Sequence, residues 1–160
     1  MLGGCGFRPV YAPATAGSPS AASGLASVYV TLIPEHSGQL LRDALQRRME
    51  LGGAGSSKLY NLAVAFYVAT EGASIERAES VPTRIRAAGI ATWSLTTADA
   101  EQRTVLTGRA RSLDGNNSLS LQYFYSDLQS EQMQARLVDA VADQITTAIA
   151  TWFALHPPTA

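Results

Sequence analysis

The sequence predicts an α+β domain: a two-layer α/β sandwich with two helices on one face of a mixed, mostly antiparallel four-stranded sheet, in the order βαβββα. Segments that alternate apolar and polar residues indicate half-buried strands. Two other segments repeat apolar residues at intervals of three and four, as amphipathic helices do. The later strands follow one another through short connections, which favours antiparallel pairing. The apolar stripes of the helices need a partner, and one sheet face can supply it.

The first strand and the first helix are expected within residues 27–51. Residues 27–34, SVYVTLIP, are rich in β-branched and aromatic types, and the proline ends the strand. His36 or Ser37 begins the helix, which stops at Gly52-Gly53 because glycine commonly ends helices. Three arginines of this helix are expected on its solvated flank: Arg42, Arg47 and Arg48.

The next two strands are expected in residues 58–70 and 83–97, with a polar connection at 71–81. In the later strand the inward residues are Ile85, Ala87, Ala91, Trp93 and Leu95. The alternate positions face outward: Arg84, Arg86, Thr92, Ser94 and Thr96. Phe66, Tyr67 and Trp93 are interpreted as core or sheet-face packing rather than as ligand platforms.

A turn at 98–102 leads into the fourth strand at 103–111, and residues 114–117, DGNN, are expected to break the chain. Residues 118–125 could extend the sheet briefly, and the aromatic triplet at 123–125 fits either the core or an exposed contact surface. A final helix is expected from about Asp127 to before Pro157-Pro158. Its apolar stripe is Met133, Leu137, Val141, Ile145, Ile149 and Trp152.

Composition excludes several classes of function. The 160 residues favour a single domain, and a net charge of −1 argues against nucleic-acid binding, which needs a basic surface. One cysteine and two distant histidines cannot supply the ligands of a structural zinc site, so no metal or other cofactor is expected. No stretch is long and apolar enough to form a spanning helix. The chain has no Gly-x-Ser-x-Gly elbow or Gly-rich phosphate loop, and adjacent His36 and Ser37 do not make a catalytic pair, so no enzymatic activity is expected.

The sharpest short motif is Leu2-Gly3-Gly4-Cys5, which is typical of a bacterial lipobox. Small residues give a peptidase access to the bond before Cys5, and the free thiol can take a diacylglyceryl group. About two acyl chains suffice for stable membrane anchoring. The expected organisation is a signal-peptide remnant at 1–4, the lipidated Cys5 and a flexible linker at 5–26, the domain at 27–156 and a tail at 157–160. The alternative is a chance cysteine in an unstructured N-terminus.

Four arginines form the candidate binding site, because they fall on the outward faces of two strands that can pair: Arg84, Arg86, Arg109 and Arg111. Guanidinium groups bind phosphates in a forked geometry. Arg77, in the preceding connection, could join them. The alternative is a solvated sheet face on which carboxylates such as Asp114 balance the arginines.

Several segments together support a family resemblance: Gly4–Tyr11 after the lipobox, Gly38–Leu45 in the first helix, Tyr60–Leu62, Thr83–Arg86 and Ala91–Trp93, Gly108–Ala110, Tyr125–Asp127 and Ala142–Ile145. On these residues the chain resembles the lipopolysaccharide-assembly lipoproteins of the LptE family, in their alphaproteobacterial form. The resemblance spans nearly the whole chain. The segment at 128–133 departs from the family, which usually carries more alanine and acid there.

The resemblance implies a location on the periplasmic side of the outer membrane, held by the lipid anchor. It implies a plug and scaffold inside the β-barrel protein LptD, where the chain would help to assemble lipopolysaccharide and bind it. The phosphates of lipid A would then be the natural ligands of the arginines. The alternative function is a generic periplasmic scaffold lipoprotein of another envelope complex.

Overall fold

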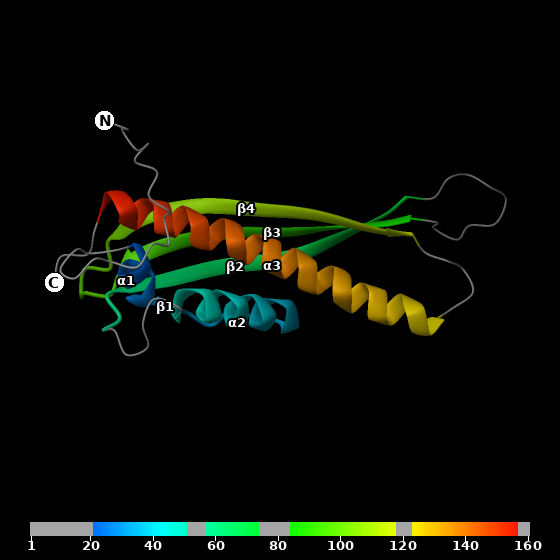
Figure 1. Cartoon of the computed structure of the whole chain (residues 1–160), viewed down its shortest axis with the longest axis horizontal. Coiled ribbons are helices and arrows are strands. Elements are labelled where there is room, and N and C mark those ends of the chain that lie inside the picture. Colours follow the sequence, from blue (N-terminus) through cyan, green and yellow to red (C-terminus); the bar gives the residue numbers. More distant parts are fainter. Residues whose placement is uncertain (1–20, 51–56, 74–83, 118–122, 157–160) are drawn as a thin grey trace, which may run out of the picture.

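The computed structural model describes residues 21–50, 57–73, 84–117 and 123–156 (Figure 1). Within these ranges, the side chains of residues 71–73, 84–85, 116–117 and 123–129 are not described. Cys5 and Arg77 lie outside the described residues, so the predictions made for them stay predictions. In the described part of the chain, no helix is long and apolar enough to cross a membrane.

The fold class is confirmed as an α+β domain in which helices cover one face of a mixed four-stranded sheet. Its elements are α1 (Ala21–Ala26), β1 (Val28–Val30), α2 (His36–Glu50), β2 (Tyr60–Ala73), β3 (Arg84–Thr97), β4 (Thr104–Asn117) and α3 (Tyr123–Leu155). The strand order is β1-β2-β3-β4; β1 and β2 are parallel, and the other two pairs are antiparallel. The first strand is shorter than the predicted range 27–34. Figure 1 shows α3 running along the sheet, with α2 beside it.

The core lies between the sheet and the two long helices. On β3, the residues predicted to face inward are buried where they are described: Ala87, Ala91, Trp93 and Leu95. The predicted stripe of α3 is also buried from Met133 to Ile149, although Trp152 keeps partial exposure. Period-two and helical patterns therefore identified the correct faces, because burial of apolar area dominates the choice of face.

The prediction of a flexible linker at 5–26 is wrong for its last six residues, because Ala21–Ala26 form the helix α1. Leu25 and Ala26 are buried in the core, and Gly24 lies so close to the ring of Phe153 that a β-carbon would overlap it. The buried hydroxyl of Ser27 donates to the carbonyl of Gly24 at 2.7 Å, which closes the end of the helix. A six-residue helix is too short to form alone, so contact with α3 stabilises it.

Two further predictions on the C-terminal half are wrong. Residues 114–117 do not break the chain, because β4 continues to Asn117 in register with the start of β3. Residues 123–125 do not extend the sheet, because α3 begins at Tyr123. At 114–117, pairing with β3 overrides the local preference of turn-forming residues.

Arg48, which is expected on a solvated flank of its helix, instead joins the two long helices. Its guanidinium bonds Asp143 at 2.7 Å and Asp139 at 3.2 Å, both on α3. Partial burial lowers the pKa of Arg48, but the hydrogen bonds and charges of Asp143 and Asp139 outweigh it, and the net pKa is raised. The bridge links α2 to α3 at the surface, above the apolar core that both helices share.

Candidate ligand-binding face

The candidate site is the sheet face that points away from the helices, which we call the open face. Arg86 on β3 and Arg109 and Arg111 on β4 are exposed there, at the positions alternating with buried Ala87, Ala91 and Ala110. The predicted grouping of these three arginines on one face is therefore confirmed. The backbone of Arg84 begins β3 at a position of the same face, but its side chain is not described. The predicted role of the four arginines in binding is not tested by their arrangement.

The strand register sets the neighbours of each arginine. Arg109 lies opposite Thr92, and Arg111 lies opposite Ile90, so neither faces a charged residue across the strand pair. Arg86 lies opposite Gly115 on β4 and Glu71 on β2. Because Arg86 has the acidic residue Glu71 as a cross-strand neighbour, Arg109 and Arg111 are the cations best suited to an external anion.

The alternative in which Asp114 balances the arginines on the open face is contradicted by the structure. Asp114 lies opposite Ala87, whose side chain is buried beneath the helices, and therefore occupies the helix side of β4. Its carboxylate forms a salt bridge with Arg136 of α3 at 2.7 Å. It also accepts a hydrogen bond from the backbone N–H of Gly115 at 2.7 Å. Within residues 61–70, 86–96 and 105–115, no carboxylate points to the open face. The described part of this face is thus cationic.

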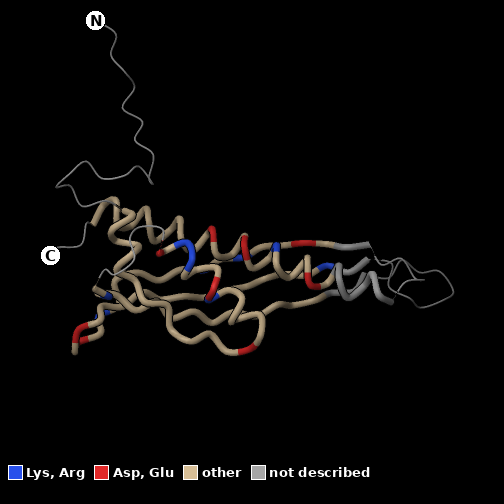
Figure 2. Tube along the Cα trace, turned by 60° about the horizontal axis from the view of Figure 1, so that its bottom comes forward, with Lys and Arg blue, Asp and Glu red and all other residues tan. Residues whose placement is uncertain are grey.

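Acidic residues instead gather on the helical layer and in turns. Exposed carboxylates lie on α2, on α3 and in the turn between β3 and β4: Asp43, Glu50, Asp99, Glu101, Glu131, Asp139 and Asp143. Figure 2 shows this distribution along the chain trace. The described part of the open face is therefore positively charged although the chain has a net charge of −1, and the helical layer is mixed or acidic.

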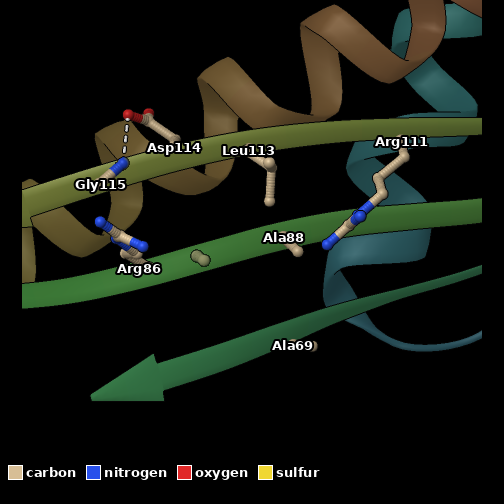
Figure 3. A pocket seen from close by; sticks show the side chains of 8 residues that line it. Ala69, Arg86, Ala88, Arg111, Leu113, Asp114 and Gly115 are labelled. Carbon is tan, nitrogen blue, oxygen red and sulfur yellow. Dashed lines mark hydrogen bonds between the residues drawn. The ribbon is translucent and has the colours of Figure 1, made fainter. Parts of the chain in front are cut away.

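A shallow groove of about 440 Å³ lies between two of the arginines (Figure 3). Ala69 and Ala88 are among its lining residues, with Leu113, whose surface is 67% exposed. Arg86 and Arg111 border it, and Figure 3 shows both side chains beside the alanines. The groove combines small apolar lining with guanidinium groups, and such a surface suits an amphipathic anion.

A second groove, also of about 440 Å³, lies on the same face nearer to β1. It is lined by Thr31, Leu32, Ala63, Val64, Ala65, Thr92, Trp93 and Ser94. Leu32 is 75% exposed, and Tyr67 on β2 is 54% exposed. The open face thus has an uncharged part near β1 and a cationic part near β4.

Leu113 is not among the residues predicted for the site, because the fourth strand is expected to end at residue 111 in the sequence. A usable signal was present: the alternation that places Arg109 and Arg111 outward continues directly to Leu113 and Gly115. Phe66 and Trp93 lie in the core and Tyr67 lies on the open face, which agrees with the prediction of core or sheet-face packing for the three residues. The aromatic triplet at 123–125 lies in the first turn of α3, and its side chains are not described.

The fold is shared with bacterial lipoproteins of known structure. A protein of Caulobacter crescentus CB15 named as a lipoprotein superposes with a TM-score of 0.67 at 21% identity, over 84% of this chain and 96% of that one. The minor lipoprotein of Acinetobacter baumannii gives a TM-score of 0.57 at 14% identity, over 84% and 96% of the two chains.

Rare lipoprotein B of Shewanella oneidensis gives a TM-score of 0.58 at 8% identity, over 81% of this chain and 97% of that one. No protein-family model matches the chain, and no curated protein matches its sequence. At these identities the likeness establishes the fold: the chain has the α+β fold of these lipoproteins.

Proposed function

We propose that this chain is an outer-membrane lipoprotein of the LptE type. Acyl chains on Cys5 would hold it on the periplasmic side of the membrane. There it would work as plug and scaffold of an LptD-like β-barrel that assembles lipopolysaccharide, and it would make or break no bond itself. The resemblance noted in the sequence and the fold shared with lipoproteins support this proposal.

The observation that carries the proposal is the cationic, partly apolar open face. Lipopolysaccharide presents phosphates next to acyl chains. Arg109 and Arg111 offer guanidinium groups without an opposing carboxylate among the described residues, and the neighbouring groove offers alanine and leucine surface. Charge-assisted bonds from arginine to phosphate are among the stronger hydrogen bonds in proteins. The Arg84, Arg86, Arg109 and Arg111 set is therefore proposed as the lipopolysaccharide contact.

The first experiment measures lipopolysaccharide binding by the purified chain. Arg109→Glu is expected to weaken binding by about tenfold or more, since it reverses a charge at the proposed contact, and added salt should weaken wild-type binding. Arg47→Glu is the matched control, because Arg47 is exposed on α2, away from the open face. Equal affinities of the two variants would reject the arginine contact.

The second experiment tests the partner and the anchor. A tagged chain captured from outer membranes should bring a large β-barrel protein with it, and mass analysis should find acyl groups on the peptide that contains Cys5. Capture without a barrel would favour a scaffold lipoprotein of another envelope complex. An unmodified thiol at Cys5 would contradict the anchor.

A further inference from the structure

The outer edge of β4 is a long sheet edge. β4 has 14 residues and stands last in the strand order, so among the described residues only β3 pairs with it. At the other end of the sheet, β1 has just 3 residues. A long edge presents backbone N–H and C=O groups that can pair with a strand of another chain. The β4 edge is therefore where self-association is expected unless something blocks it.

Gln144 of α3 contacts the main chain at this edge. The backbone N–H of Arg111 donates to Oε1 of Gln144 at 3.1 Å, and Nε2 of Gln144 donates to the carbonyl of Arg111 at 3.0 Å. In an antiparallel sheet, a hydrogen-bonded pair of residues exchanges the same two bonds. The single side-chain amide of Gln144 thus takes both groups of Arg111 that a neighbouring strand would use.

A second contact keeps α3 beside the edge. Asp114, three positions along β4 from Arg111, bonds Arg136 of α3 at 2.7 Å. Figure 1 shows α3 running across the helix-covered side of the sheet, and α3 makes extensive contact with β4. Gln144 is consequently presented to the edge by a helix that is attached to the same strand at two points.

The side chain of Arg111 opposes the same pairing. If two copies paired antiparallel through β4 about Arg111, the two Arg111 side chains would lie directly opposite each other, with Arg109 opposite Leu113. Like charges in such cross-strand positions destabilise a sheet. Both the main chain and the side chain of Arg111 therefore disfavour addition of a second copy.

We propose that Gln144 closes the β4 edge against a second copy of this chain, and that the charge of Arg111 reinforces the closure. The two hydrogen bonds are solvent-exposed, so their contribution to folding is small. Their effect is to occupy a pairing site. The closed edge prevents the sheet from continuing into a second copy. This inference does not depend on which ligand the open face binds.

The first test is amide hydrogen exchange by NMR on the full chain under reducing conditions. Gln144→Leu removes both hydrogen bonds at similar side-chain size and is expected to speed exchange of the Arg111 amide about tenfold. The amide of Ala110, on the β3 side, should keep its rate. Thr147→Leu is the control, because Thr147 is exposed on the same helix. An unchanged rate at Arg111 would overturn the proposal.

The second test is sedimentation across the micromolar range. The wild-type chain and Thr147→Leu should remain monomeric, whereas Gln144→Leu combined with Arg111→Thr should form dimers as concentration rises. In those dimers the amides of Arg109 and Leu113 should become protected from exchange. A combined variant that stays monomeric, or dimers in which these two amides remain unprotected, would contradict closure of this edge.

Discussion

The two faces of the sheet are built from the same strands and differ sharply in composition. On the helix side, β2 and β3 place large apolar residues such as Leu62, Phe66 and Trp93, all buried. On the open face, the alternate positions hold small residues such as Ala63, Ala65 and Thr92. A solvated face of an antiparallel sheet is usually polar. The open face instead combines small and apolar residues with arginines, which fits a surface that binds something outside the domain.

The two faces also differ in the state of their charged side chains: those on the helix side form ion pairs between elements, and those on the open face are available for binding. The ion pairs that join different elements, from Arg48 to α3 and from Arg136 to Asp114, lie on the helix side. The arginines of the open face have no ionic partner among the described residues. Substitutions on the two faces should therefore have different consequences, and the following changes test that difference.

The largest effect is expected from Phe153→Ala. Phe153 is 1% exposed and packs against Gly24 and Tyr60, with its ring centroid 5.3 Å from that of Tyr60. Truncation should lower the free energy of unfolding by about 3–5 kcal/mol, measured by urea denaturation. Tyr67→Ala on the open face is the control and should cost less than about 1 kcal/mol. A similar loss of unfolding free energy in the two variants would contradict the distinction between the faces.

A smaller effect is expected from Gly108→Ala on the helix side of β4. Gly108 lies opposite Trp93, and an added β-carbon would overlap the indole ring, which is buried. Because the ring must shift within a packed core, we expect a loss of about 1–3 kcal/mol in thermal or urea unfolding. Thr107→Ala, one residue away on the open face, should change stability by no more than about 0.5 kcal/mol.

The smallest effect concerns the turn between β3 and β4. Hydrogen bonds from the Thr97 hydroxyl and the Gln102 N–H, together with the charge of Arg103, lower the pKa of Asp99 from its ordinary value of 3.8. The stabilisation is therefore present above that ordinary pKa and is lost as the pH falls through the lower folded value. Asp99→Asn should be slightly less stable than wild type at neutral pH. The difference should vanish in strong acid, and a difference that grows on acidification would contradict this account.

Much of the fold could be predicted from the sequence because each side chain along a strand or helix is assigned to a face by local periodicity. The alternation in 85–95 and the spacing from Met133 to Ile149 place the core correctly without knowledge of any contact. The same alternation placed Arg86, Arg109 and Arg111 together, which supplied most of the candidate face.

The tertiary structure alone decided the features that depend on partners distant in the sequence. Residues 114–117 are typical turn formers, yet they pair with β3, and Asp114 bonds Arg136 instead of neutralising the open face. Residues 21–26 have the composition of a linker, yet they form α1 because Gly24 admits Phe153. Arg48 likewise forms a hydrogen bond with Asp143, which is 95 positions away, and Gln144 forms one with Arg111, which is 33 positions away. Local sequence determines which face a residue occupies, whereas packing and long-range hydrogen bonds determine what it contacts there.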